Sequence, residues 1–265
     1  MSSDATVSPV RLDHDGAVVT LTLSRPDALN GIDEGVLAAL PPMLADVAAD
    51  SESKALVITG EGDRAFSVGL DLGLLGRAFA DPDYFADVVH RFKQILLDVE
   101  HLPIPVVAAV NGLARAGGFE LLLACDLVLV ADEARVGDTH VAFGIPPGGG
   151  ASQRLPRRVG PQVAAEILYT GGWMTGPECV DAGVALRSVP RSDLSAAVER
   201  LVGPIRPLSR AALVATKRCV TDGRGLPIQQ AVEVELDHFV RHLRDEPTAD
   251  EGYRAYVEGR EPSWP

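Results

Sequence analysis

The stretch from Asn111 to Asp126 constrains what this chain can fold into more than any other. A strand-like run of valines and alanines, Val106–Val110, ends at Asn111-Gly112, a dipeptide typical of turns. Two further glycines, Gly117 and Gly118, open a continuous apolar run that contains one carboxylate, Glu120. The run is too apolar for a surface helix, so we expect a buried helix that is entered through a tight turn.

The residues of this turn alone leave two explanations open. Gly117 and Gly118 have no Cβ, so the backbone could approach a bound group closely. The first N–H groups of a helix that starts there lack internal partners and lie at the positive end of its dipole. They would stabilise developing negative charge, with Glu120 one turn away as an acid or base. Alternatively, the glycines serve tight packing and Glu120 only complements the dipole. A capping box is excluded, because Gly117 stands where Ser or Thr is required.

Length and composition predict a globular protein with a full core. The chain has 265 residues, and 46% of them are hydrophobic, which excludes a disordered chain. The segment Met1–Pro9 is polar and acidic and has no apolar signal core, so we expect a loose tail on a cytoplasmic protein. Three cysteines without CxxC spacing indicate neither a disulfide framework nor a metal site.

Charge and motif content exclude several classes of partner. A net charge of −13 argues against nucleic acid and anionic membrane surfaces, and no apolar run approaches membrane-spanning length. An anionic ligand would therefore need local help from arginine, lysine or backbone N–H groups. The glycine-rich loop Gly144–Gly150 lacks the Gly-Lys-Ser/Thr ending of a P-loop, and no stretch fits GxGxxG. Nucleotide hydrolysis and nicotinamide binding are not supported.

Strand-like and helical segments alternate in the first part of the chain, which indicates an α/β layer architecture. The expected strands are residues 18–23, 55–59, 106–110 and 127–130, and the clearest amphipathic helix is residues 83–100. A helix over residues 34–49 should kink or restart at Pro41-Pro42, because each interior proline costs about 3 kcal/mol. From Pro161 onward the chain reads as mainly helical, with a boundary at Pro204 and Pro207 and helices expected over residues 207–220, 227–244 and 248–258.

Several motifs, taken in order, carry a resemblance to a known family. The order is Arg25-Pro26 with Ala28-Leu29-Asn30, Phe66-Ser67-Val68-Gly69-Leu70-Asp71-Leu72, Asn111-Gly112 with Gly117-Gly118-Phe119-Glu120-Leu121 and Cys125-Asp126, and Gly144-Ile145-Pro146 with Gly149-Gly150 and Gln153-Arg154-Leu155-Pro156. The pattern continues through Thr170-Gly171, Asp181-Ala182-Gly183-Val184, Thr216-Lys217 and Glu251-Gly252 to Glu258-Gly259-Arg260. In these motifs the chain resembles the crotonase, or enoyl-CoA hydratase/isomerase, superfamily from Leu12 to Pro262.

The resemblance implies an α/β fold, a crotonase-like spiral of ββα units with a C-terminal helical extension. Residues 1–200 would form the core with the thioester site, and residues 201–265 a helical region used in trimer formation. It implies a homo-oligomer, either a trimer or a dimer of trimers. The implied partner is an acyl-CoA thioester substrate. Coenzyme A is then part of the substrate, and neither another cofactor nor a metal is expected.

The same resemblance implies the residues of the site. The backbone N–H groups of Leu70 and Gly117 would form an oxyanion hole for the thioester oxygen, and losing one such donor typically costs about 10²–10³-fold in rate. Further substrate contacts are implied at Ala28, Val68, Asp71, Leu72 and Gly118. The segment Leu74–Phe85 would border the acyl pocket.

The second acidic position of the family's hydratases departs from the pattern. Those enzymes use two glutamates, and Glu120 matches the first, but His140 stands where the second is expected. A histidine could act as general acid or base, since its ordinary pKa of about 6.5 suits neutral pH. An ionised Glu120 nearby would favour the imidazolium, whereas burial would oppose it. Alternatively, His140 only packs in a pocket whose chemistry needs Glu120 or neither group. Asp138 is an adjacent residue with an orienting or loop role.

Other polar residues receive structural explanations. We expect Cys125 to be a buried small hydrophobe and Asp126 to satisfy backbone groups at a helix end. The acidic segment from Asp245 to Glu251 should be a solvated loop. Four basic residues could meet CoA phosphates, although surface placement or an ion pair within the protein is the default for each: Arg25, Arg154, Lys217 and Arg260.

The expected activity is addition of water across the double bond of a 2-enoyl-CoA. A single base, Glu120, would also suffice for an enoyl-CoA isomerase, and a histidine in the pocket would suit a hydrolase or a C–C bond-cleaving enzyme. A member of the family that binds acyl-CoA without catalysis is the remaining alternative. Chain length, head group, stereochemistry and pathway do not follow from the residues.

Overall fold

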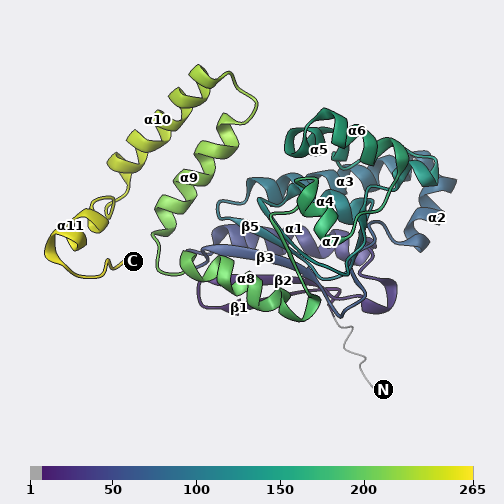
Figure 1. Cartoon of the computed structure of the whole chain (residues 1–265), viewed down its shortest axis with the longest axis horizontal. Helices are drawn as coiled ribbons and strands as arrows, with labels where there is room; N and C mark the ends of the chain where they lie inside the picture. Colours follow the sequence, from purple (N-terminus) through teal and green to yellow (C-terminus); the bar gives the residue numbers. More distant parts are fainter. Residues whose placement is uncertain (1–7, 265) are drawn as a thin grey trace.

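Two β-sheets organise the core of the molecule (Figure 1). The structure is a computed structural model and describes residues 8–264. The larger sheet has the strand order β1-β2-β3-β5-β7-β9, and only the β1–β2 pair is antiparallel within it. Its strands are β1 (Val10–Asp15), β2 (Val18–Leu23), β3 (Ala55–Gly60), β5 (Val106–Val110), β7 (Leu127–Ala131) and β9 (Arg187–Val189). The smaller, parallel sheet consists of β4 (Ala65–Ser67), β6 (Leu113–Arg115) and β8 (Val136–Gly137). The predicted α/β architecture and all of the predicted strands are confirmed.

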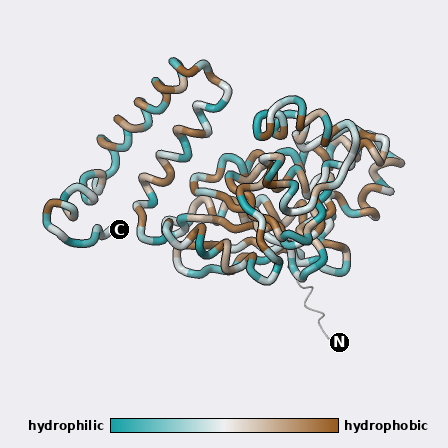
Figure 2. The backbone as a smooth tube through the Cα atoms, viewed as in Figure 1, coloured by the Kyte–Doolittle hydropathy of each residue, from teal (hydrophilic) through white to brown (hydrophobic). Residues whose placement is uncertain are grey.

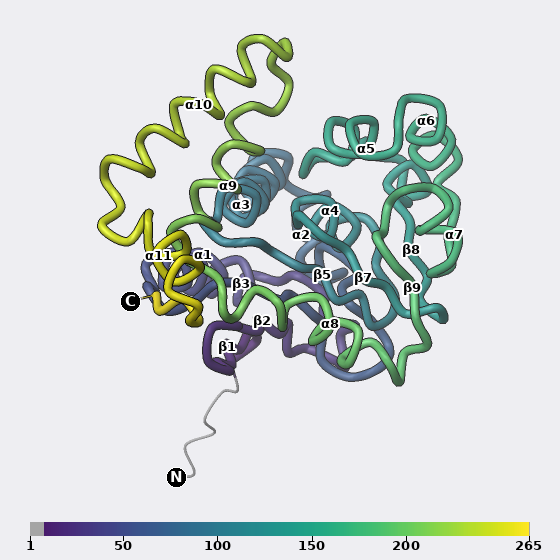
Figure 3. Tube along the Cα trace, turned by 60° about the vertical axis from the view of Figure 1, so that its left-hand side comes forward, coloured from purple at the N-terminus to yellow at the C-terminus, as the bar shows by residue number. Residues whose placement is uncertain are grey.

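The central strand β5 is buried on both faces, as parallel strands covered by helices are. Val106, Ala108 and Val110 face a large apolar cluster, whereas Val107 and Ala109 face a smaller one. The first cluster also contains side chains of α1 (Glu34–Ala49), α3 (Pro82–His101) and α4 (Gly117–Ala124). The second contains side chains of α8 (Leu194–Val202), so helices cover both faces of the sheet (Figure 3).

The remaining helices of the core are α2 (Leu72–Ala80), α5 (Ala151–Val159), α6 (Pro161–Thr170) and α7 (Gly176–Asp181), with 3₁₀ turns at Pro26–Ala28, His140–Phe143, Arg191–Asp193 and Gly203–Ile205. The predicted amphipathic helix is α3, which buries Val88, Phe92 and Leu96 on one face. The turn predicted at Asn111-Gly112 leads through the short strand β6 into α4. Every residue of α4 is buried, as its apolar composition predicted.

The helix α1 does not restart at Pro41-Pro42, contrary to one alternative in the prediction. It is a single helix in which both prolines are exposed, while Val36, Leu40 and Leu44 are buried on the opposite face. Neither proline has an N–H, so the carbonyls of Leu37 and Ala38, four residues earlier, lose their partners within the helix. Burial of the apolar face therefore outweighs the local cost of the prolines.

The C-terminal helices α9 (Arg210–Gly223) and α10 (Ile228–Asp245) form an antiparallel pair that projects from the core (Figure 1). No residue of α10 is buried. Hydrophobic residues, brown in Figure 2, nevertheless recur along both helices. Those with exposed side chains include Val220, Ile228, Val232, Leu236, Phe239 and Leu243. The three helices predicted after Pro207 are α9, α10 and α11 (Glu251–Glu258).

Basic residues of the motifs form ion pairs within the chain, as their default explanation predicted. Lys217 Nζ of α9 donates to Asp126 Oδ2 at 2.7 Å and to the carbonyl of Ile104 at 2.9 Å. Asp126 also accepts from Val106 N at 2.8 Å, so it satisfies the start of β5 and not a helix end. This contact joins the C-terminal helices to the central strand.

The other basic residues of the motifs are also paired. Arg25 bridges Asp33 and Asp71, Arg154 pairs with Glu100, and Arg260 pairs with Glu251. Glu251 is only 6% exposed, so the prediction of a fully solvated acidic loop is wrong at its last residue. The Arg260 guanidinium holds the pKa of Glu251 at about 2.

Two predictions concern the ends and the exterior of the chain. Of the tail expected over Met1–Pro9, the part from Met1 to Val7 lies outside the described residues. The first strand, β1, begins at Val10. Over residues 8–264, no helix is both long and apolar enough to cross a bilayer.

Candidate active site

Two backbone bends from different sheet connections meet at the centre of the candidate site. The first follows β4 at Gly69, which has φ +78°, and the second joins β6 to α4 at Gly117. They touch so closely that a Cβ on Gly69 would lie 2.5 Å from Gly117 N. Ser67 Oγ accepts from Gly69 N at 3.2 Å and fixes the first bend. Only glycine fits at position 69, for both conformation and space.

The contact places the Leu70 and Gly117 amides next to one another. Within residues 8–264, neither amide donates a hydrogen bond to a protein acceptor, and both residues line the same cavity. Ala116, which precedes the helix, has φ 48° and ψ −118°, a strained conformation for a residue with a side chain. Its own N–H donates to the carbonyls of Gly137 and Asp138, which hold the bend in place.

Glu120 lies one turn into α4 and is 2% exposed. Its Oε1 accepts from Ala151 N at 3.1 Å, at the start of α5. A Cβ on Gly149 would lie 2.5 Å from Glu120 Oε2, so the glycine-rich loop makes room for the carboxylate. Arg154 donates to the Gly149 carbonyl at 2.7 Å and keeps this loop in place. The glycine-rich loop Gly144–Gly150, which lacks the P-loop motif, therefore packs against the Glu120 carboxylate.

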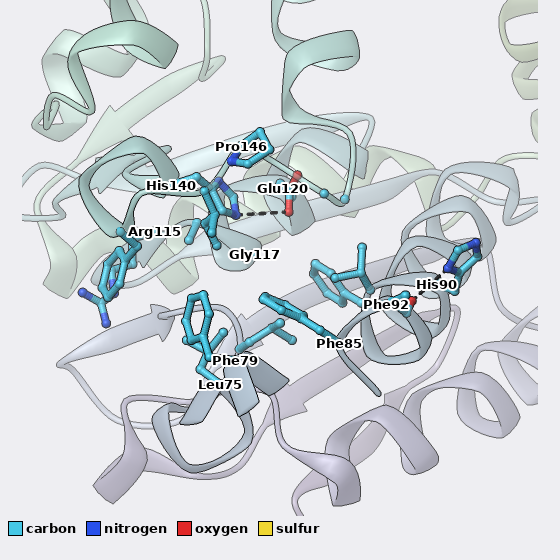
Figure 4. Close-up of a pocket in the computed structure, with 18 of the residues that line it drawn as sticks. Leu75, Phe79, Phe85, His90, Phe92, Arg115, Gly117, Glu120, His140 and Pro146 are labelled. Atoms are coloured by element: carbon cyan, nitrogen blue, oxygen red, sulfur yellow. Dashed lines mark hydrogen bonds and ion pairs between the residues drawn. The ribbon is translucent and has the colours of Figure 1, made fainter. Parts of the chain in front are cut away.

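His140 lies opposite Glu120 and is 7% exposed. Its Nε2 is 3.8 Å from Glu120 Oε2, which is an ion-pair distance but too long for a hydrogen bond (Figure 4). Its Nδ1 is 3.0 Å from Oδ1 of Asp138, which also accepts from His140 N at 3.2 Å. Asp138 is fully buried and therefore fixes the orientation of the imidazole, in agreement with the orienting role considered for it.

The pKa values of Glu120 and His140 are both raised, but for different reasons. Burial raises the pKa of Glu120, and the nearby His140 and the Ala151 N–H only partly oppose this shift. Burial alone would lower the pKa of His140, but the hydrogen bond to Asp138 and the charge of Glu120 outweigh it and raise that pKa. The imidazolium is therefore favoured beside an ionised Glu120.

These groups open onto one cavity of about 470 Å³. Glu120, His140, Leu70 and Gly117 lie on its wall, and its remaining lining is mostly apolar. The apolar part includes Val68, Leu75, Phe79, Phe85, Val89 and Phe92 (Figure 4). The predicted border of the acyl pocket, Leu74–Phe85, supplies several of these side chains.

Four of the residues implied as substrate contacts do not line this cavity. Asp71 caps α2 by accepting from Gly73 N at 2.8 Å, and Leu72 is 67% exposed beside it. A Cβ on Gly118 would collide with the Ser67 carbonyl, so Gly118 serves packing of α4 against β4. Ala28 ends a 3₁₀ turn outside the cavity. Contact of these residues with substrate stays a prediction.

The sequence interpretation did not identify Gly149 and Ala151 as parts of the site. Both were visible as a glycine-rich segment directly before a helix, which is a common way to present backbone N–H groups to an anion. Both lie near Glu120, which precedes them by 29 and 31 residues (149 − 120 = 29 and 151 − 120 = 31). No local pattern contains that contact.

Comparison with known proteins agrees with this architecture. The family model for enoyl-CoA hydratase/isomerase matches residues 13–265. A crotonyl-CoA hydratase of Syntrophomonas wolfei is 30% identical over 250 residues, which cover 94% of this chain and 95% of that protein. A carnitinyl-CoA dehydratase of Salmonella typhimurium is 32% identical over 259 residues, which cover 96% of this chain and 97% of that protein.

Solved structures of enoyl-CoA hydratases superpose on nearly the whole chain. The crystal structure of an enoyl-CoA hydratase from Bacillus anthracis has a TM-score of 0.91 at 29% identity and covers 97% of this chain and 98% of its own. That of an enoyl-CoA hydratase from Mycobacterium smegmatis has a TM-score of 0.90 at 31% identity, with the same coverage. The fold inferred from the motifs is thereby confirmed, and the chain belongs to the enoyl-CoA hydratase/isomerase family.

Proposed function

We propose that this protein is an acyl-CoA-processing enzyme that adds water across the double bond of a 2-enoyl-CoA thioester. One observation carries the proposal: two free backbone amides, a buried carboxylate and a histidine open onto the same apolar cavity. Relatives named as hydratases, at about 30% identity over most of the chain, support the same reaction. Coenzyme A belongs to the substrate, and the proposal requires no other cofactor and no metal.

In this proposal the Leu70 and Gly117 amides bind the thioester oxygen. When water adds to the β-carbon, electrons move through the double bond and negative charge develops on that oxygen. Donors that already point at this position stabilise the enolate-like state more than the substrate, which lowers the barrier. The backbone supplies the donors, so the side chain of Leu70 is free to line the acyl pocket.

Glu120 and His140 then share the two proton transfers. The Glu120 carboxylate takes a proton from water as the oxygen bonds to the β-carbon, and the His140 imidazolium gives a proton to the α-carbon. One proton is taken and one is given, so the product carries one added water. The raised pKa of each group suits its role, because a carboxylate of higher pKa is a better base and a raised histidine pKa favours the imidazolium.

An enoyl-CoA isomerase is the second candidate, because Glu120 is the one carboxylate among the described residues that line the cavity. A single base could remove a proton from one carbon of a 3-enoyl-CoA and return it to another. Hydrolysis or C–C bond cleavage with Glu120 and His140 and acyl-CoA binding without catalysis are further outcomes of the test below. The exchange of the second glutamate for His140 is the reason to test them directly.

The decisive experiment is an assay of the purified protein with 2-enoyl-CoA substrates of several chain lengths. Hydration removes the absorbance of the conjugated thioester and adds the mass of water to the product. Parallel incubations with a 3-enoyl-CoA and with a β-diketone would reveal isomerase or cleavage activity by product mass. If no chain length loses the enoyl absorbance, hydration is excluded. A His140→Glu variant that gains hydration would mark a different native reaction.

We further propose that residues 201–265 form the contacts of a homo-oligomer, a trimer or a dimer of trimers. Support comes from the apolar side chains that α9 and α10 leave exposed to solvent. Leu236 is 51% exposed and Phe239 is 56% exposed. Exposed apolar surface of this extent is typical of protein interfaces. A cytoplasmic location is part of the same proposal. Light scattering would give the mass of the particle in solution.

The Asp138→Asn variant should move the alkaline limb of the pH–rate profile to lower pH. The hydrogen bond that His140 Nδ1 donates to the Asp138 carboxylate helps to raise the pKa of His140, so its loss lets burial lower that pKa. The imidazolium then deprotonates at lower pH, and kcat at neutral pH should fall about ten- to hundredfold, as expected for one hydrogen bond to a charged group. Rates measured at several pH values would show this shift.

A purely structural Asp138 predicts a different result for the same variant. Its melting temperature would fall, while the pH limbs of the remaining activity would stay where they are in the wild type. Circular dichroism on the samples used for kinetics separates the two cases.

A further inference from the structure

Arg115 is a cation on the wall of an otherwise mostly apolar cavity. It ends strand β6, two residues before Gly117, so its position is fixed by the same backbone that presents the Gly117 amide. Its guanidinium carbon lies 5.2 Å from the centre of the Phe143 ring. In the view of Figure 4, Arg115 lies on one side of Gly117, and Phe92 and His90 lie on the other.

The Arg115 guanidinium has no partner in the part of the chain that the structure describes. No carboxylate lies within ion-pair distance of it, no hydrogen bond from it is formed, and its Nε is buried without an acceptor. The other arginines of the family motifs behave differently, since Arg25, Arg154 and Arg260 each pair with a carboxylate. Acidic residues outnumber basic ones by 37 to 24, so a shortage of carboxylates does not explain the difference.

Stacking on Phe143 does not account for Arg115 by itself. A cation–π contact stabilises the charge from the ring face, but it uses none of the five N–H donors of the guanidinium. The buried Nε is left without an acceptor, which is unfavourable, whereas a planar fork of donors matches a carboxylate or phosphate. The contact with Phe143 holds the guanidinium at this part of the cavity wall.

We propose that Arg115 binds an anionic oxygen group of the bound thioester. This inference rests on the proposed function, since it assumes an acyl-CoA in the cavity. Two parts of that ligand could supply the group: a phosphate of coenzyme A, or a carboxylate at the far end of the acyl chain. The thioester oxygen sits at Leu70 and Gly117, and the two arms of the thioester leave this point in different directions. In this proposal the Arg115 guanidinium binds the anionic group on one of these two arms.

The test is a binding experiment that does not depend on catalysis. Saturated thioesters cannot be hydrated, so their Kd is measured by calorimetry for wild type, Arg115→Met and Arg115→Lys. Four ligands separate the sources of the anion: butyryl and glutaryl groups, each on coenzyme A and on N-acetylcysteamine. Glutaryl adds a terminal carboxylate, and N-acetylcysteamine removes every phosphate.

The matched control is Arg135→Met. Arg135 also stacks on an aromatic ring, with its guanidinium carbon 5.0 Å from the centre of Trp173, but it does not line the cavity. Loss of a cation and of a ring contact is therefore the same in both methionine variants. The control should leave all four Kd values unchanged.

Two results support the proposal and identify the anion. If Arg115→Met weakens both coenzyme A ligands about ten- to hundredfold and leaves the N-acetylcysteamine ligands unchanged, a phosphate is bound. If it weakens both glutaryl ligands on either carrier and spares the butyryl ligands, an acyl carboxylate is bound. In both cases Arg115→Lys should retain part of the affinity, because it keeps the charge without the fork.

Two other results would overturn it. One is an unchanged Kd for all four ligands. The other is a change of particle mass without a change of Kd, which would assign Arg115 to a contact between subunits. Failure of the hydration assay leaves this test intact, because wild-type binding of the saturated ligands is measured separately.

Discussion

Glu120→Gln should hydrate 2-enoyl-CoA about 10²–10⁴-fold more slowly than the wild type while it binds saturated acyl-CoA with a similar Kd. Glutamine has the shape of glutamate, and its carbonyl oxygen can still accept the Ala151 N–H that Glu120 Oε1 accepts at 3.1 Å. The amide cannot take a proton from water at neutral pH. The loss should therefore appear in kcat, because ground-state contacts remain.

The thermal stability of the same variant should rise. Burial raises the pKa of Glu120 above its value in the unfolded chain, so the folded protein binds a proton there more tightly than the unfolded one. The stability contributed at this site therefore declines as pH rises through the titration of the carboxyl, so the ionised carboxylate costs the folded protein stability. A neutral amide removes this cost. Slower catalysis with a higher melting temperature is the behaviour of a functional residue kept at the expense of stability.

Glu251→Gln is a matched control for this prediction. Glu251 is also a buried carboxylate, but Arg260 holds its pKa low, and it lies on α11 outside the cavity. Its replacement should lower the melting temperature and leave kcat unchanged. A Glu120→Gln variant with near wild-type turnover would contradict the acid–base role of Glu120 and favour acyl-CoA binding without catalysis.

The individual strands and helices of this fold could be predicted because each is determined by the residue pattern of a short stretch of sequence. β5 and α3 carry the strand and helix periodicities along their own length, and their bounds differ from the predicted ones by at most one residue. Pro41-Pro42 misled the prediction, because a local penalty was weighed without the burial of Val36, Leu40 and Leu44 on the other face. That burial depends on elements far away in the chain.

The site was predictable only to the extent that each of its parts is local. The bends at Gly69 and Gly117 and the carboxylate of Glu120 follow from their own motifs. The contact of Gly69 with Gly117, and that of Glu120 with Ala151, join segments separated by dozens of residues (117 − 69 = 48 and 151 − 120 = 31). That the Arg115 guanidinium has no partner among residues 8–264 can be recognised only once those residues are placed in space.

Gly69→Ala should lose about 10²–10³-fold in kcat, the effect of removing one donor from a pair that stabilises an oxyanion. The residue has φ +78°, a conformation that L-residues rarely adopt, and a Cβ there would lie 2.5 Å from Gly117 N. The clash can be relieved only if one bend moves. The Leu70 amide follows Gly69 directly in the chain, so such a movement changes its direction relative to the Gly117 amide.

Gly76→Ala is the matched control, since it adds the same methyl group nearby at no conformational cost. Gly76 lies within α2, and apart from its chain neighbours and the backbone of its own helix no described atom is within 4 Å of the position that its Cβ would take. Alanine there should stabilise the helix by about 0.5–1 kcal/mol and leave kcat unchanged. If Gly69→Ala kept both full kcat and its fold, the two amides could not be acting together on one oxygen, because their contact could not have survived the substitution. A crystal structure of Gly69→Ala with a bound saturated acyl-CoA would show which bend moved, and the larger the movement of the Leu70 amide, the larger the expected loss of rate.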